Sequence, residues 1–317
     1  MKAWVFTGAG QPLELEDVPD PQPKPGEVVI DIKATGLCHS DVAALDDPSW
    51  AVNFGYTPIV LGHEPVGVVS ALGEGVASLA VGDRVGIPSG PPASVGYQRD
   101  GAYAEKTTAP ADAVVKVPDA LDFVRAASGT DAGNVAYHAV VSRGQVRKGE
   151  KVGIIGIGGL GQIGARIAVV LGCEVYVAEP KESVWPMARD LGAVRIERDI
   201  TDLADADLDV IIDFAGFGTT TAGAIDVVRR GGRVIQVGMG RLRAEINTNN
   251  LIVKQVDLKG SMGGGTTELA GVWDLMARGD LDPALSIVPF ADIDKGLDRL
   301  RRGEVQGRLV VDLQNGI

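Results

Sequence analysis

The sequence of 317 residues predicts an α/β protein in which a β-rich part is followed by a doubly wound parallel sheet. Short strands separated by Pro/Gly turns fill the chain up to about residue 130. From Lys151 onward, apolar runs alternate with stretches able to form helices, and a glycine-rich turn opens this region. Since a chain of this length can form two domains of ordinary size, we expect two distinct parts.

The first part is predicted to be all β. Its strands are expected at residues 27–35, 65–73 and 113–119, and its turns at the proline-rich segments 19–27 and 88–96. Proline and glycine interrupt strands and set tight turns, so the loops are expected to be irregular.

The second part is predicted to be a parallel sheet covered on both faces, because alternating strands and helices form such sheets. Five apolar runs are its expected strands: 151–155, 173–178, 208–216, 232–238 and 257–261. The tail returns to a strand at 285–290, an amphipathic helix at 293–303 and a strand at 307–313 that could pair with the first part.

Charge and composition favour a small-molecule partner. The net charge of -12 argues against a nucleic-acid or anionic-membrane surface, since phosphate-binding surfaces need clustered Lys and Arg. The start lacks a basic segment followed by an apolar run, and no apolar stretch is long enough to cross a membrane. Cys38 and Cys173 cannot form a disulfide framework. We therefore expect a cytoplasmic protein.

The glycine-rich turn predicts a dinucleotide site. Gly156, Gly158 and Gly161 stand between a strand and a helix, where glycines allow a tight turn, close approach of a pyrophosphate and close helix packing. Glu179 follows Gly156 by 23 positions, near the separation expected for an acid that binds ribose hydroxyls. Its charge would repel a 2'-phosphate, so NAD is favoured over NADP. The alternative is a turn without a ligand. The expected cofactor-binding set here is Gly156, Gly158, Gly159, Leu160, Gly161 and Glu179.

The adjacent Cys38 and His39, followed by His63, raise the question of a metal. Thiolate and imidazole are ligands that zinc prefers, and catalytic zinc takes three protein ligands with one position open. Cys173 is a poor third ligand because it opens a strand of the nucleotide-binding region. Taken alone, Cys38 would more often be an inert buried thiol.

Six motifs in order make the sequence resemble the zinc-dependent medium-chain alcohol dehydrogenases over nearly its whole length. They are GLCHSD (36–41), GHE (62–64), VGDRV (81–85), GAYAE (101–105), GIGGLG (156–161) and GRLVVDL (307–313). The resemblance implies a GroES-like β catalytic domain at 1–132, completed by 280–317, and a Rossmann NAD-binding domain at 133–279. It also implies hydride transfer between an alcohol and NAD(P).

The resemblance further implies that Cys38 and His63 bind a catalytic zinc. Where many members carry a cysteine as third ligand, this chain has Asp131. Zinc could be lost or kept with the carboxylate; charge accounting favours retention, because a thiolate and a carboxylate neutralise Zn²⁺ as fully as two thiolates. Glu64 is expected beside the ligand set, as a partner of the ligands or an occasional fourth ligand. The four cysteines of a structural zinc have no match here, so one zinc per chain is expected.

Other roles come from the same resemblance. Ser40 is expected to hydrogen-bond the substrate oxygen and start a proton relay, with a plain turn hydroxyl as the alternative. His39 and Arg308 are expected near the cofactor phosphates, Arg308 also meeting Asp41 across the chain ends, and a surface histidine is the alternative for His39. Gly238 and Met239 are expected behind the nicotinamide.

The sequence thus predicts an NAD-dependent, zinc-dependent alcohol dehydrogenase or carbonyl reductase, leaning toward secondary alcohols and ketones. Two alternatives remain: a zinc-free quinone or enoyl reductase of the same fold, and a nucleotide-binding protein without catalysis. The resemblance implies a homodimer or homotetramer.

Overall fold

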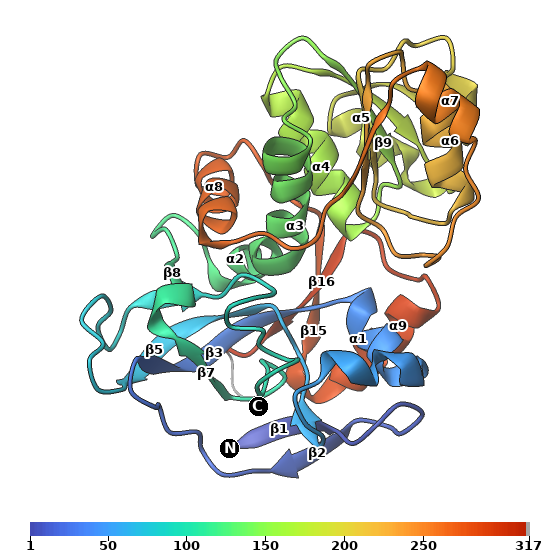
Figure 1. Ribbon diagram of the computed structural model, residues 1–317. Helices are drawn as coiled ribbons and strands as arrows, with labels where there is room; N and C mark the ends of the chain where they lie inside the picture. Colours follow the sequence, from blue (N-terminus) through green and yellow to red (C-terminus); the bar gives the residue numbers. More distant parts are fainter. Residues whose placement is uncertain (315–317) are drawn as a thin grey trace. The chain divides into compact units, whose positions relative to one another are not determined.

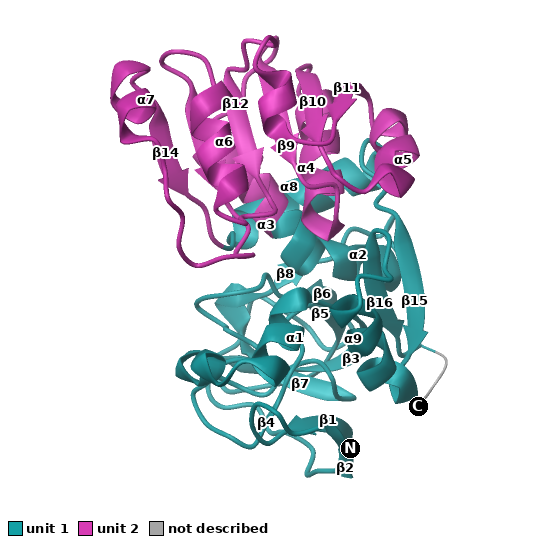
Figure 2. Ribbon diagram, turned by 90° about the vertical axis from the view of Figure 1, so that its right-hand side faces the viewer, with its two compact units in different colours: residues 1–134, 263–317 teal, residues 135–262 magenta. Residues whose placement is uncertain are grey.

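The computed structural model describes residues 1–314 and divides into two compact units. Unit 1 comprises Met1–Asn134 and Gly263–Ile317, and unit 2 comprises Val135–Met262 (Figure 2). No helix among the described residues is long and apolar enough to cross a membrane.

Unit 1 is built on two sheets (Figure 1). The seven-stranded sheet has the order β15-β16-β3-β5-β6-β8, with β7 also pairing with β3. Its strands are β3 (Glu27–Leu37), β5 (Pro65–Leu72), β6 (Arg84–Gly86), β7 (Lys106–Pro110), β8 (Val115–Lys116), β15 (Leu285–Pro289) and β16 (Arg308–Asp312). The three-stranded sheet β2-β1-β4 contains β1 (Lys2–Phe6), β2 (Glu14–Asp17) and β4 (Ile59–Val60).

The long strand β3 organises unit 1 because it pairs on both sides. Val28, Ile30 and Ile32 alternate along it and are buried in the core. The tail pairs back as the sequence suggested: β16 lies antiparallel to β3, with Val310 opposite Gly36. Both chain ends therefore contribute to a single core.

Unit 2 contains the parallel sheet β11-β10-β9-β12-β13-β14. Its strands are β9 (Lys151–Ile155), β10 (Glu174–Ala178), β11 (Ala193–Glu197), β12 (Val210–Asp213), β13 (Arg233–Gln236) and β14 (Asp257–Gly260), and its helices are α4 (Gly159–Val170), α5 (Trp185–Asp190), α6 (Thr219–Val227) and α7 (Thr248–Val253). Strand order runs outward from β9 in one direction and from β12 in the other. Right-handed connections therefore place α4 and α6 on opposite faces. The predicted fold class, a Rossmann sheet with a β domain, is confirmed.

The remaining helices are α1 (His39–Asp46), α2 (Phe123–Ser128), α8 (Thr266–Ala277) and α9 (Ile293–Arg301) in unit 1, with α3 (Asn134–Tyr137) at the boundary of the units. Unit 1 resumes at Gly263, whereas we expected residue 280. The reason is α8, whose fully buried Trp273 donates through Nε1 to the carbonyl of Ala126 in α2 at 3.0 Å. This helix thus packs with the β domain.

Candidate active site

Antiparallel pairing brings three distant segments to one edge of the main sheet of unit 1. Cys38 follows the end of β3, and Glu64 immediately precedes β5. Arg308 is the first residue of β16. Because β5 and β16 both run antiparallel to β3, their beginnings meet its end. Sheet register alone therefore gathers residues that are up to 270 positions apart in the sequence (308 minus 38).

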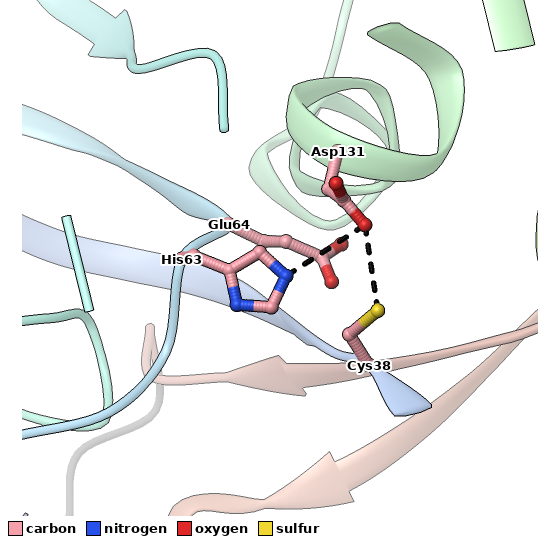
Figure 3. A group of neighbouring side chains, drawn as sticks. All are labelled: Cys38, His63, Glu64 and Asp131. Carbon is pink, nitrogen blue, oxygen red and sulfur yellow. Dashed lines mark hydrogen bonds and ion pairs between the residues drawn. The ribbon is translucent and has the colours of Figure 1, made fainter. Parts of the chain in front are cut away.

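The helical segment after α2 supplies Asp131. Its turn Gly129–Gly133 is wound as a π-helix, a local form that is often found at functional sites. Trp273 lies so close to Gly129 that a Cβ there would come within 2.6 Å of the indole nitrogen. The backbone of this turn is thus held tightly. Figure 3 shows Asp131 pointing from the helix toward Cys38, His63 and Glu64.

These four side chains form a candidate metal centre. One potential ligand atom from each of Cys38, His63, Glu64 and Asp131 lies within 4.8 Å of all the others. Sγ of Cys38 lies 3.5 Å from Oδ2 of Asp131, and Nε2 of His63 lies 3.7 Å from the same oxygen (Figure 3). Thiolate, imidazole and carboxylate are zinc ligands, and their buried convergence fits that metal.

His63 is oriented by its surroundings. Its Nδ1 lies 3.2 Å from Oδ1 of Asp41, while Nε2 lies 3.3 Å from the hydroxyl oxygen of Ser40. Asp41 thus occupies one side of the ring and leaves Nε2 facing Asp131, an arrangement typical of metal-binding histidines. Burial opposes a charge on the ring, but the interactions with Tyr97 and the two aspartates outweigh it and raise the pKa of His63.

The carboxylate of Asp131 has a lowered pKa, and both of its oxygens accept hydrogen bonds. Oδ1 accepts a hydrogen bond from Ser89 at 2.7 Å, and Oδ2 accepts one from Nη2 of Arg308 at 2.9 Å. Burial would raise the pKa of Asp131, but the contact with His63, the charge of Arg308 and the Ser89 hydroxyl hold it well below its usual range. A buried but charged carboxylate is what a zinc ligand at this place requires.

Glu64 is held differently. Arg308 donates to both of its oxygens, through Nε to Oε2 at 3.2 Å and through Nη2 to Oε1. The carboxylate also fills the space beside Gly36, where a Cβ would come within 1.9 Å of Oε2. Burial raises the pKa of Glu64 to about 7 despite the arginine. Near neutral pH, Glu64 is therefore less fully ionised than Asp131.

One expected contact is wrong: Arg308 meets Glu64 and Asp131 rather than Asp41. Oδ2 of Asp41 instead accepts hydrogen bonds from the hydroxyl of Tyr103 at 2.7 Å and from the amide of Cys38 at 3.1 Å. The reason is the register of β16, which places Arg308 beside the two carboxylates.

In unit 2, the strand order reverses between β9 and β12, so their carboxyl ends form the switch point where ligands bind in such sheets. The glycine-rich turn lies there. Gly156 has a φ of +85°, and a Cβ on Gly161 would come within 1.8 Å of the Gly156 carbonyl oxygen. A Cβ on Gly158 would meet nothing within 4 Å, which leaves its face open to a ligand. Gly159 and Leu160 form the first turn of α4.

Glu179 follows β10 and faces the same turn. One carboxylate oxygen accepts from the amide of Ile157 at 2.9 Å, and the other accepts from the amide of Lys181 at 2.8 Å. Gly238 and the exposed Met239 follow β13, also at the carboxyl edge of the sheet. The expected cofactor residues of unit 2 therefore share one edge. In unit 1, His39 is exposed at the start of α1.

Comparison with known proteins agrees with this geometry. Residues 24–119 match the family model "Alcohol dehydrogenase GroES-like domain", and residues 159–278 match "Zinc-binding dehydrogenase". An alcohol dehydrogenase of Geobacillus stearothermophilus is 33% identical over 99% of both chains. The chain belongs to the zinc-dependent medium-chain alcohol dehydrogenase family.

Two solved structures resemble the protein over almost their whole length. Acetophenone reductase from Geotrichum candidum, in complex with NAD, has a TM-score of 0.90 and 31% identity and covers 100% of this chain and 98% of its own. The alcohol dehydrogenase of Aeropyrum pernix has a TM-score of 0.88 and 29% identity, covering 98% of this chain and 100% of its own.

Two residues beside the family's metal position were missed by sequence reasoning. The centroid of the Tyr97 ring lies 5.2 Å from that of the His63 ring. On its other neighbour, Phe54, the Tyr97 ring stacks with a centroid distance of 5.8 Å. Ser89 reaches Asp131 from the loop after β6. Tyr97 and Ser89 both lie between β6 and β7, in a segment that contains no cysteine. An isolated tyrosine or serine in a Pro/Gly-rich loop has no sequence signature, because its role depends on where the loop folds.

Proposed function

We propose that this protein is an NAD-dependent oxidoreductase of alcohols and carbonyl compounds that uses one zinc per chain, held by Cys38, His63 and Asp131. The observation that carries the proposal is the convergence of these three different ligand types, with Glu64, within 4.8 Å. When bound, zinc would supply Lewis acidity toward the substrate oxygen, and NAD(H) would accept or supply the hydride.

The chain's own residues would prepare the site. Asp41 fixes the His63 ring by its position at Nδ1, 3.2 Å away. Ser40, whose hydroxyl oxygen lies near Nε2 of His63, would donate a hydrogen bond to the substrate oxygen and pass a proton to or from it. Arg308 balances the charges of Glu64 and Asp131, so that two buried carboxylates can stand side by side.

In unit 2, the turn 156–161 would hold the pyrophosphate at the beginning of α4, and Glu179 would bind the adenosine ribose. Gly238 and Met239 would lie by the nicotinamide, and His39 and Arg308 near the phosphates. For the substrate class we favour secondary alcohols and ketones. Asp131 in the third ligand position favours them, as does the likeness to a reductase named for acetophenone, a ketone.

We also propose that the protein acts as a homodimer or homotetramer. β14 is an edge strand of the described sheet and carries the exposed Leu258. The preceding helix α7 exposes Ile252 and Val253. Apolar side chains beside an open strand edge are typical of a surface that is covered in an assembly.

The test is zinc content and NADH-linked carbonyl reduction, measured before and after chelation on protein purified without an affinity metal. We expect close to one zinc per chain and activity that is lost and regained with it. Asp131→Ala should lower zinc occupancy and activity together, the latter by about a hundredfold or more. Active protein without zinc would instead identify a metal-free reductase, and NADH binding without turnover a non-catalytic protein.

A further inference from the structure

The two oxygens of the Asp131 carboxylate lie in different surroundings. Oδ2 faces the other ligand candidates, with Cys38 Sγ at 3.5 Å and His63 Nε2 at 3.7 Å. Oδ1 instead accepts a hydrogen bond from the hydroxyl of Ser89 at 2.7 Å. Only one of the two oxygens is therefore presented to the candidate metal centre.

Ser89 is built to hold this bond. It follows β6, which pairs antiparallel with β5, so the loop begins at the same sheet edge as His63. Ser89 is 8% exposed, and its amide donates to the carbonyl of Thr130 at 2.9 Å. Ser89 thus donates two hydrogen bonds to the π-helical turn, one from its amide to Thr130 and one from its hydroxyl to Asp131. The hydroxyl has little freedom to turn elsewhere.

Position 131 needs such support because of its chemistry. A thiolate offers a metal a single sulfur, whereas a carboxylate offers two oxygens and can rotate about its Cβ–Cγ bond. The guanidinium of Arg308 donates to Oδ2 of Asp131 at 2.9 Å, so it competes with a metal for this oxygen. Hydrogen-bond partners of metal ligands orient them and tune the affinity for the metal.

We propose that Ser89 is a positioning residue that makes Asp131 a one-oxygen zinc ligand through Oδ2. This inference rests on the proposed function, in which Asp131 is the third ligand. The loop after β6 then fixes the plane of the Asp131 carboxylate through Ser89, while Arg308 balances the negative charge of Asp131.

The first experiment compares zinc affinity in Ser89→Ala and wild-type protein by competition with a chromophoric chelator. We expect affinity to fall about tenfold or more. The d–d absorption spectrum of Co²⁺-substituted protein should also change, because the freed carboxylate can bind through both oxygens. Ser70→Ala, in a half-buried position near the far end of β5, is the matched control and should behave as wild type. Unchanged affinity and spectrum in Ser89→Ala would overturn the inference.

The second experiment repeats the comparison with Asp131→Cys, the residue that many family members carry. A thiolate has one donor atom, so Ser89→Ala should change zinc affinity by less than about twofold in this background. An equal loss in both backgrounds would mean that Ser89 acts through the loop alone, and would refute the inference. Failure of the proposed function looks different, since wild-type protein would then bind no zinc or Asp131→Ala would bind it normally.

Discussion

At the residue scale, the site depends on which buried group carries which charge. Asp131 is held ionised, while burial raises the pKa of Glu64 to about 7, although both contact Arg308. The difference follows from their neighbours: Asp131 has His63 and Ser89 in addition to the arginine, whereas Glu64 fills a closed space beside Gly36. Two carboxyl groups that contact the same arginine therefore have pKa values that are shifted in opposite directions.

Ser40 provides the first residue-scale prediction. Ser40→Ala should lower kcat by about 10²- to 10⁴-fold, the usual contribution of a positioned proton donor, while zinc per chain stays near the wild-type value. The reason is that its hydroxyl oxygen lies near Nε2 of His63 without being part of the ligand set. Steady-state kinetics and elemental mass spectrometry on one preparation measure both. Ser40→Thr, which keeps a hydroxyl, should recover most of the rate. Wild-type turnover in Ser40→Ala would assign the proton to another group.

At the element scale, each site is formed where strands begin or end. Three metal candidates, Cys38, His63 and Glu64, lie at the end of β3 and just before β5, where β16 begins with Arg308, and the cofactor turn lies at the carboxyl ends of β9 and β12. The segment β9-α4-β10 also places Glu179 beside this turn, where its carboxylate accepts a hydrogen bond from the amide of Ile157. Strand ends converge on one edge because sheet pairing fixes their register.

The preference between NADH and NADPH should depend on Glu179, which follows β10. We expect a lower KM for NADH than for NADPH, because the carboxylate of Glu179 would repel a 2'-phosphate. Glu179→Gln keeps the shape and removes the charge, and should narrow the ratio of the two KM values by about tenfold. Both constants come from initial rates with a single carbonyl substrate. Equal KM values in the wild-type enzyme would remove Glu179 as the discriminator.

At the scale of the whole molecule, both chain ends complete unit 1, and the metal candidates tie its segments together. Cys38 and His63 come from the first segments and Asp131 from the helical turn, while Arg308, which pairs with Glu64 and Asp131, comes from the returning tail. A ligand that binds only the folded state stabilises it by mass action. Zinc should therefore add to the stability of this unit as well as to its chemistry.

Thermal unfolding tests this expectation. Zinc at about 100 times its Kd should contribute about 2.7 kcal/mol, which corresponds to a rise in Tm of several degrees. Scanning calorimetry with zinc and with chelator measures the difference, and Asp131→Ala should show almost none. A zinc-dependent rise of the same size in Asp131→Ala would place the stabilising ion elsewhere.

The sequence by itself determined the alternation of strands and helices, the glycine-rich turn and, through motif resemblance, the ligand candidates Cys38, His63 and Asp131. The alternation and the glycine-rich turn are local features, since periodicity and spacing within one segment carry them, whereas the ligand candidates follow from the resemblance of several motifs along the chain. Only the tertiary structure decided that Arg308 meets Glu64 and Asp131, that α8 packs with unit 1, and that Ser89 and Tyr97 stand beside the ligands. These contacts join segments far apart in the chain, and their partners are set by strand register and loop packing, which leave no pattern in the sequence.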